Sequence, residues 1–458
     1  MTHSWYENAV SSSLPSRRTV LWLCVLACVA NVVLVGALAG AGVLKSTERG
    51  DVQYTDTETR PGGDIVVPAD ADYRFAIESP TDADAFYNMV VRVWSGGPLF
   101  NTWMPDNVQE FHYLPITYYF FAAISVFGYV TFKYLLFGLS LLATAGGTYL
   151  LLDAETEFAG LDLSRAAMLG LSAASAGFAP MVSNFKVGQV TPFAYLSVGV
   201  AWWAYRRSND AAGGAALAIP TMLKPYWMAS LAVFISPTER RWYGVLGFAA
   251  AFAVANVLSA AAFGIETTIQ YYEIILTELS SEANAAGPIT GWSVEAIRPF
   301  WFLGEFATVA RLLSVLPVAW VWSRYVRGRT DFDVSLFVLT IVMQFTLLQS
   351  TTLIDLGLVL AAFVVLGVHC YEDGGWPFAL LGLSFLLAHT HTYAMEVLVG
   401  NGHTNLAVIF DGEPLLKLLQ PAVYGVAFLY LLGLWAASDG AVSTGARDIR
   451  DAEGSGAD

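Results

Sequence analysis

The side chains best suited to chemistry gather in a few short segments of an otherwise apolar chain. Asp82 and Asp84 stand two residues apart, just before the aromatic pair Phe86 and Tyr87. A carboxylate can take up the proton of a reacting hydroxyl group, and an aromatic ring offers a flat surface for a sugar ring or a lipid chain. This acidic and aromatic segment is therefore the first candidate for a reaction centre.

Cationic and amide side chains form a second set, suited to binding an anion. Lys224 lies inside an apolar stretch, where an ionisable group is costly and indicates a function, although its stem can also extend to the membrane interface. Arg298, near Trp292, is suited either to a phosphate or to lipid head groups. Lys186 and Gln189 occupy a turn before a helix, whose free N–H groups favour anions. Gln189 is equally suited to capping that helix.

Histidines are few, and their spacing does not predict a metal centre. His112 and Tyr113 precede a proline in an aromatic stretch that is typical either of sugar binding or of an interfacial aromatic belt. His389, His391 and His403 lie near one another in the sequence, but no acidic residue stands at ligand spacing. The sequence therefore predicts no cofactor and leaves dependence on a divalent metal open.

In their order along the chain, these segments resemble the polyprenol-phosphate-mannose-dependent mannosyltransferases of glycosyltransferase family 87, within the GT-C class. The family pattern has an Asp before an aromatic pair, a Gly-Gly-Pro-Leu-Tyr-like turn, a Tyr-x-Pro, a Gly-Gln and a Lys-Pro. The resemblance extends from about Thr81 to Arg241 and is weak beyond. The matching elements here are Asp82, Phe86-Tyr87, Gly96 to Phe100, Tyr113 to Pro115, Gly188-Gln189 and Lys224-Pro225.

The resemblance implies a reaction and a role for each candidate. A hexose, most of all mannose, passes from a polyprenyl or dolichyl phosphate to an external glycan or glycolipid. Asp82 is the expected general base, with Asp84 in reserve. The residues expected at the donor phosphate are Lys224, Arg298, Gln189 and Lys186, and those expected at the substrates are Tyr87, His112, Tyr113, Trp292 and Asp355.

One departure from the family pattern keeps other functions open. Many members carry a histidine at the outer end of a late helix, whereas the corresponding residues 349–355 here contain none and end on Asp355. Either Asp355 replaces that histidine, or the acceptor chemistry differs, or the chain is a divergent, non-catalytic relative. A transporter or lipid-glycan flippase is a further alternative, although such proteins commonly have broken helices in both halves, and the sequence shows one clear break, at Lys224.

The elements that must position these residues are membrane helices. Hydrophobic residues make up 56% and charged residues 13% of the 458 residues, too apolar a composition for one soluble core of this length. Residues 20–44 contain no charge and are long enough to cross a bilayer. We predict an all-α, polytopic, GT-C-like bundle of about twelve transmembrane helices over residues 20–438. Its large first external loop, residues 45–131, is expected to carry interfacial helices, and a second external loop covers residues 264–304.

Basic residues predict the orientation of the chain. Arg17 and Arg18 before the first helix, and Arg206 and Arg207 after a later one, favour the cytoplasmic side. Both the N-terminal residues 1–19 and the acidic tail, residues 439–458, are then cytoplasmic, and the active site faces outward from the plasma membrane. The net charge of −15 argues against nucleic acid as a partner and suits a halophilic archaeon.

Overall fold

The computed structural model describes most of the chain in separate stretches. These are residues 14–40, 52–54, 58–59, 65–66, 73–75, 82–100, 113–223, 225–235, 242–284, 296–327, 332–347, 351–399 and 418–438.

Within these stretches the chain is predominantly helical, which agrees with the predicted class. The helices are α2 (Arg17–Gly40), α3 (Asp82–Trp94), η1 (Pro115–Thr117), α4 (Tyr118–Ser125), α5 (Tyr129–Ala159), α6 (Arg165–Ser175), α7 (Ala179–Val187), α8 (Thr191–Arg206), α9 (Asp210–Leu223), η2 (Pro225–Phe234), α10 (Trp242–Phe263), α11 (Ile265–Asn284), η4 (Trp301–Phe306), α12 (Ala307–Leu313), α13 (Val315–Val326), α14 (Asp333–Leu347), α15 (Leu353–Leu356), α16 (Val359–Asp373), α17 (Gly375–Val399) and α20 (Pro421–Ser438).

Three short antiparallel strand pairs, which the sequence did not predict, accompany the helices. They are β1 (Val52–Tyr54) with β4 (Tyr73–Phe75), β2 (Glu58–Thr59) with β3 (Ile65–Val66), and β5 (Ala296–Ile297) with β6 (Thr351–Thr352). The last pair joins two segments that are more than fifty residues apart in the sequence.

The long helices are apolar enough to lie in a membrane. Five described helices have the length and composition of a membrane span, and a sixth results if the bent pair α6 and α7 is taken as one. Shorter apolar helices accompany them at 333–347, 359–371 and 421–437. The chain is therefore a membrane protein, while the number of about twelve crossings stays a prediction.

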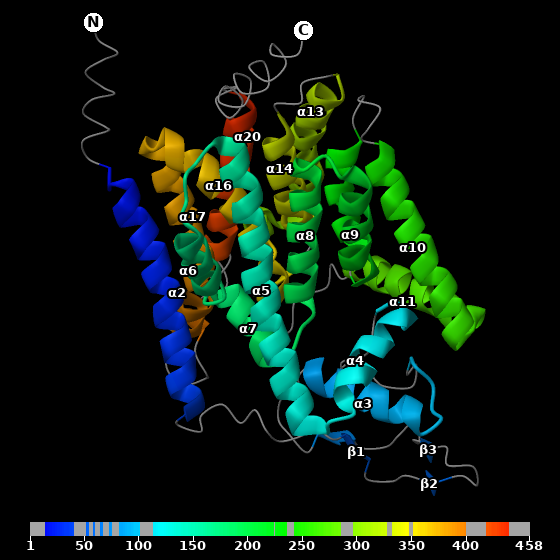
Figure 1. Ribbon diagram of the computed structural model, residues 1–458. Helices are drawn as coiled ribbons and strands as arrows, with labels where there is room; N and C mark the ends of the chain where they lie inside the picture. Colours follow the sequence, from blue (N-terminus) through cyan, green and yellow to red (C-terminus); the bar gives the residue numbers. More distant parts are fainter. Residues whose placement is uncertain are drawn as a thin grey trace, which may run out of the picture.

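The helices form a bundle with two different ends (Figure 1). The start of α2 and the end of α20 lie at one end, where Arg17 packs on the backbone of Gly374 and Trp376 contacts Trp435. The short helices α3 and α4 lie at the opposite end, called here the outer end. Helix α4 has eight residues, about 12 Å at 1.5 Å per residue, which is too short to cross a bilayer.

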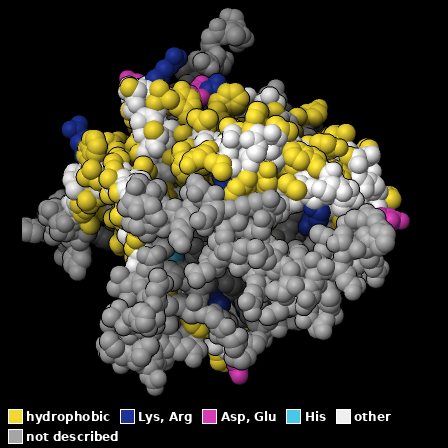
Figure 2. All heavy atoms as spheres, turned by 90° about the horizontal axis from the view of Figure 1, so that it is seen from below, with side chains coloured by type: hydrophobic (Ala, Val, Ile, Leu, Met, Phe, Trp, Pro, Cys, Tyr) yellow, Lys and Arg dark blue, Asp and Glu magenta, His cyan; other side chains and the backbone are white. Residues whose placement is uncertain are grey.

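Viewed onto the outer end, hydrophobic side chains dominate the described surface, and charged side chains interrupt it only at scattered places (Figure 2). Large apolar side chains such as Leu142, Val257 and Leu312 are more than three-fifths exposed. Exposed apolar side chains of this kind are expected on helices that lipid surrounds, because water would oppose such exposure.

Two of the helices are broken. Helix α9 ends at Leu223 and η2 begins at Pro225, so the predicted interruption of this apolar stretch is confirmed. Phe234, at the end of η2, packs against Gly213 and Tyr205, so η2 runs back along α9 as a hairpin. The second break, a 60° bend between α6 and α7, was not predicted.

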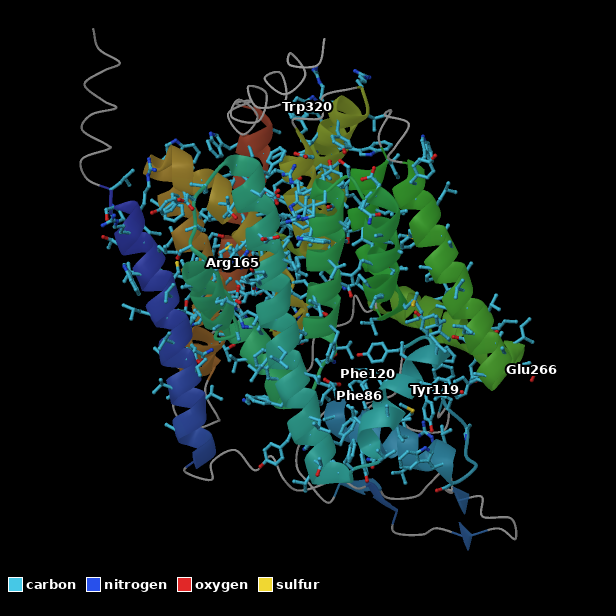
Figure 3. The ribbon with its side chains drawn as sticks, viewed as in Figure 1. Phe86, Tyr119, Phe120, Arg165, Glu266 and Trp320 are labelled. Carbon is cyan, nitrogen blue, oxygen red and sulfur yellow. The ribbon has the colours of Figure 1, made fainter. Side chains whose placement is uncertain are left out.

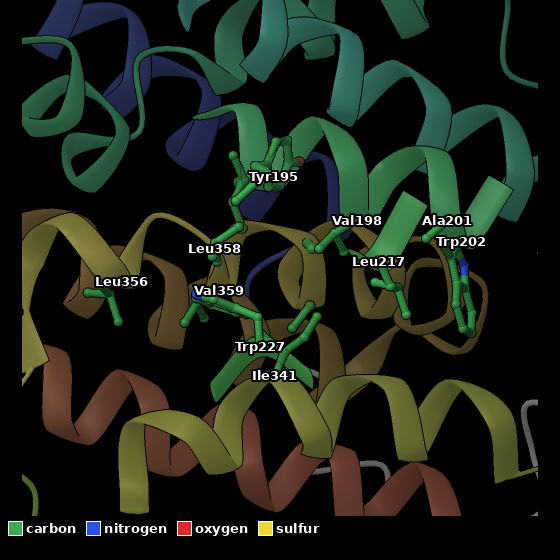
Figure 4. Packing of buried hydrophobic residues seen from close by; sticks show 14 of the residues in the cluster. Tyr195, Val198, Ala201, Trp202, Leu217, Trp227, Ile341, Leu356, Leu358 and Val359 are labelled. Carbon is green, nitrogen blue, oxygen red and sulfur yellow. The ribbon is translucent and has the colours of Figure 1, made fainter. Parts of the chain in front are cut away.

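The centre of the bundle is filled by interlocking apolar side chains from helices far apart in the sequence (Figure 4). Trp227 of η2, Tyr195 of α8 and Ile341 of α14 are each at most 1% exposed. Phe86 of α3 stacks on Phe121 of α4 at 4.3 Å. Figure 3 shows Phe86 and Phe120 together at the outer end and Trp320 at the other.

At the end of the bundle opposite α3, a buried charge cluster ties four helices together. The Arg206 guanidinium lies 2.7 Å from the Glu155 carboxylate and 2.6 Å from that of Asp333. His369 Nε2 lies 2.5 Å from the second oxygen of Glu155. Arg206 also lies over the Phe158 ring. Helices α5, α8, α14 and α16 therefore meet at one ionic centre that the sequence analysis did not foresee.

Epitope tags would test the predicted orientation. We expect tags after Asn209 and Arg329 to be accessible only in permeabilised cells, and tags near Thr57 and Glu282 to be accessible in intact ones, because the arginines flanking the first pair favour the cytoplasm. Antibody binding before and after permeabilisation measures this. A tag after Asn209 that is labelled in intact cells would contradict the orientation.

Candidate functional site

The acidic segment of the sequence forms the N-terminus of helix α3. This N-terminus packs closely against the Gly-Gln turn. Asp82 is the first residue of α3, and Ala83 is 3% exposed. Gly188 has a φ of +78°, and a Cβ at this position would lie 2.6 Å from Cβ of Ala83. Glycine is thus required both by the left-handed backbone and by the close approach of α3. The structure therefore brings Asp82 and Gln189 to one place across about a hundred residues of sequence.

An aromatic and amide contact joins a third segment to this place. The Tyr113 hydroxyl donates to Oε1 of Gln189 at 3.1 Å, and the Tyr113 ring lies 5.6 Å from that of Phe86. Gln189 Oε1 also accepts from the backbone N–H of Val190 at 3.2 Å, but Val190 is the N-cap of α8 and receives no side-chain cap, so Gln189 does not cap this helix. Tyr87 contacts the rings of Tyr129 and Phe132 at the start of α5.

The same segment reaches the break in the α9 hairpin. The backbone N–H of Leu114 donates to the carbonyl of Met222 at 3.4 Å, and the Tyr271 hydroxyl of α11 donates to the same carbonyl at 3.1 Å. Met222 stands two residues before Lys224. The Tyr-x-Pro segment thus lies between the Gly-Gln turn and the Lys-Pro break.

A cavity of about 480 Å³ adjoins the start of α3. Its walls come from α2, α5 and α7, and they also include Ala176 after the end of α6, one residue of α3 and Gly188 of the Gly-Gln turn. The lining residues are Val32, Val35, Gly36, Ala83, Val130, Lys133, Tyr134, Leu136, Phe137, Leu141, Ala176, Val182, Phe185, Lys186 and Gly188. We call this the outer cavity.

The outer cavity combines apolar walls with two cations. Lys133 is the fifth residue of α5, with its ammonium 5.0 Å from the centre of the Tyr129 ring. Lys186 lies in the last turn of α7 and is exposed. Apolar walls suit a hydrocarbon chain, and ammonium groups suit a phosphate. The cavity is therefore suited to an amphipathic, anionic lipid whose head lies next to Asp82.

A second group of predicted residues lies on neighbouring elements. Arg298 follows β5, its backbone N–H donates to Gln420 at 2.8 Å, and its guanidinium lies 5.4 Å from the centre of the Trp301 ring. Partial burial lowers the pKa of this guanidinium below its ordinary value. Asp355 is buried in α15, which packs on α7. Neither residue lines the outer cavity.

Several predicted residues lie outside what the structure describes. They are His112, Lys224 and Trp292, together with the side chain of Asp84. Their roles stay predictions.

The two described histidines of α17 are hydrogen-bonded to backbone. Nδ1 of His389 accepts from the N–H of Ala179 at 3.2 Å, and the ring also bonds to the backbone of Ala27. Nδ1 of His391 accepts from the N–H of Ala422 at 3.4 Å. Among the described residues, no three His, Cys, Asp or Glu side chains group as a metal site.

Lys133 lines the outer cavity but is not among the residues that the sequence singled out. It lies in α5, which is long and apolar enough to span a membrane, and an ionisable residue in such a helix indicates a function. The sequence did not show that α5 brings this lysine to the same cavity as Lys186, because more than fifty residues separate the two.

Comparison with known proteins gives one match. The model of glycosyltransferase family 87 matches residues 111–351, more than half of the chain. The match extends well beyond Arg241, past which the resemblance read from the sequence is weak, and it begins after Asp82. No curated protein matches the chain.

Proposed function

Since the chain belongs to glycosyltransferase family 87, we propose that it transfers a hexose, most of all mannose, from a polyprenyl or dolichyl phosphate to an extracytoplasmic glycan or glycolipid. The outer cavity is the observation that carries this proposal. It joins apolar walls, two ammonium groups and the start of the helix that begins with Asp82. A lipid-phosphate sugar has the same succession of parts: a hydrocarbon chain, a phosphate and a sugar.

In this proposal the hydrocarbon chain of the donor lies along α2 and α5 in the outer cavity, among side chains such as Val32 and Phe137. Burial of each methylene group contributes about 0.8 kcal/mol relative to water. In a membrane the surrounding lipid provides a similar apolar environment. The cavity therefore fixes where the hydrocarbon chain of the donor lies and contributes little to the affinity for the donor. The head group then lies at a fixed depth beside α3.

Lys133 and Lys186 bind the donor phosphate. When the bond between the anomeric carbon and the phosphate oxygen breaks, the phosphate gains negative charge, and nearby cations stabilise that charge in the transition state. Lys224 is a further proposed contributor to phosphate binding, and so is Arg298, although Arg298 does not line the outer cavity. Gln189 orients Tyr113, whose ring lies against Phe86.

Asp82 acts as the general base. It takes the proton of the acceptor hydroxyl while that oxygen attacks the anomeric carbon, and the polyprenyl phosphate leaves with the bonding electrons. Displacement in one step inverts the anomeric configuration and needs no covalent enzyme intermediate. Asp82 occupies the first position of a helix, where the helix dipole favours negative charge.

The activity itself is tested with membranes that contain the protein and a radiolabelled lipid-phosphate sugar. We expect transfer of label to a glycan or glycolipid fraction with mannose as the sugar, and a lower rate with glucose. Movement of labelled lipid across the bilayer without transfer would favour a flippase instead. The bend between α6 and α7 does not supply the paired breaks of a transporter, because it lies in the same half of the chain as the break at Lys224.

Removing a phosphate-binding cation should weaken donor use. We expect Lys133→Ala and Lys186→Ala each to raise the KM for the lipid-phosphate donor about tenfold, since a hydrogen bond to a charged group contributes about 1.5–3 kcal/mol. Lys→Arg at each position should retain most of the affinity. Tyr134→Phe, which changes the same wall without a charge, is the matched control. If KM is unchanged in both alanine variants, the donor phosphate does not bind in the outer cavity.

A further inference from the structure

A second cavity, of about 230 Å³, lies beside the other half of α2. We call it the inner cavity. Helices α2, α5, α6, α16 and α17 surround it, and α2 stands at the edge of the bundle (Figure 1). Helix α2 lines the inner cavity over residues 20–28 and the outer cavity over residues 32–36. The two cavities are therefore separate sites on one helix.

The inner cavity is suited to a hydrocarbon and not to a polar ligand. Most of its walls are Leu, Val, Phe and Cys side chains. The hydroxyl groups of Thr148 and Ser175 are 2.8 Å apart. Thr148 is also 2.8 Å from the Tyr195 hydroxyl, and Ser175 donates to the carbonyl of Ser172. These wall groups are already hydrogen-bonded within the protein, so water gains little by entering.

The shape of the cavity follows α2. At one end Val20 packs against Gly382, where an added Cβ would lie 2.2 Å from the valine methyl group. At the other end the carbonyl of Cys28 packs equally closely on Gly177. Between these contacts the cavity follows α2 for about 12 Å. An empty space of this kind loses dispersion contacts along its walls, and within a membrane a lipid chain is the hydrocarbon at hand to fill it.

Positive charge stands at one end of this cavity. Arg17 and Arg18 begin α2, three and two residues before Val20. The Arg17 guanidinium lies 5.9 Å from the centre of the Tyr371 ring, and Tyr371 is itself a wall residue. Basic residues next to a membrane helix attract anionic lipid head groups.

We propose that the inner cavity holds a hydrocarbon chain of an anionic phospholipid whose phosphate lies at Arg17 and Arg18. This lipid belongs to the leaflet on the N-terminal side of the bundle and fixes α2 against α6 and α17. It is distinct from the proposed sugar donor, and the proposal does not depend on transferase activity.

The test compares two lipids with identical chains and different head groups. Delipidated protein in detergent receives phosphatidylglycerol or phosphatidylcholine, and the Tm is followed by fluorescence of its 14 tryptophans. We expect phosphatidylglycerol to raise the Tm by a few degrees more than phosphatidylcholine, because a ligand that binds only the folded state stabilises it. Inorganic phosphate alone should give no such gain. If the two lipids raise the Tm equally, Arg17 and Arg18 do not bind an anionic head group.

Two sets of variants locate the lipid. Cys24→Phe fills the inner cavity and should remove the gain from either lipid, whereas Leu26→Phe, at an exposed position of the same helix, should keep it. Arg17→Gln with Arg18→Gln should remove only the advantage of phosphatidylglycerol, and Arg327→Gln should leave it unchanged. If a folded Cys24→Phe protein shows the full lipid-induced rise in Tm, the inner cavity does not hold the lipid chain. If that variant does not fold, native mass spectrometry of the wild-type protein provides the test. The proposal then requires that an anionic lipid co-purifies with the wild-type protein and is lost in the double arginine variant.

Discussion

Asp82→Asn is expected to lower the rate of sugar transfer by a hundredfold or more while the protein folds and inserts normally. General base catalysis contributes about 10²–10⁴ in rate, and an amide cannot take up the proton. Asp82 is also the first residue of α3, a position where a carboxylate can stabilise the helix without any catalytic role. Loss of the charge at this helix start should cost about 0.3–1 kcal/mol of stability, a small change in Tm that is measured separately from the much larger change in rate, so this substitution separates the two roles. Initial rates of transfer at saturating donor, together with the Tm, measure both.

Asp84→Asn is the matched control for that experiment. It removes the same charge two residues further along α3 and should have the smaller effect on transfer. If the two effects are reversed, Asp84 is the base, and the mechanism stands with the other carboxylate. If neither variant slows a demonstrated transfer, this helix does not supply the base.

Arg206→Gln should cause the largest loss of stability among substitutions of the arginines that end α8. The Arg206 side chain is 5% exposed and lies between Glu155 and Asp333. Without it the buried carboxylates of Glu155 and Asp333 lose the cation that they share, and breaking a buried ion pair costs about 3–5 kcal/mol. We expect a much lower yield of folded protein and a clearly lower Tm, measured by fluorescence-detected size-exclusion chromatography after heating.

The neighbouring arginine provides the control. Arg207 pairs with Asp153 and Glu157, but its side chain is 40% exposed, and ion pairs at such positions contribute about 0–1 kcal/mol. Arg207→Gln should therefore change the Tm little. The charge cluster lies at the end of the bundle opposite α3, so the Arg206→Gln protein that does fold should keep the wild-type KM for donor. Equal stability of the two variants would show that the cluster does not hold the four helices.

Much of the helical architecture follows directly from the order of residues. The apolar runs at residues 20–44, 132–152 and 245–263 correspond to α2, α5 and α10, because in lipid each backbone group must bond within its own segment. The break at Lys224 followed from the charge and the adjacent proline. The bend between α6 and α7 was missed, although Gly177 and Pro180 lie at it. The apolar pattern continues through both helices, and only packing on Cys28 and the neighbouring helices decides where the chain turns.

Only part of the candidate site was predictable, because the sequence shows local residue patterns but not the packing between distant segments. Local patterns marked Asp82, Gln189 and Tyr113, and the structure joins Gln189 to Tyr113 by a hydrogen bond and to the start of α3 through Gly188. Lys133 escaped notice because its role depends on where α5 lies relative to α7. Such proximity between distant segments is set by side-chain packing, which no local pattern records.

The sequence by itself determined that the chain is a helical membrane protein and which polar segments stand out from its apolar background. The position of Arg206 shows what only the tertiary structure decided. Local charge marked Arg206 and Arg207 alike as cytoplasmic loop residues, yet the first is buried against two carboxylates and the second is partly exposed. Burying an arginine is favourable only where its counter-charges are supplied, and these come from α5 and α14, more than fifty residues before it and more than a hundred after it.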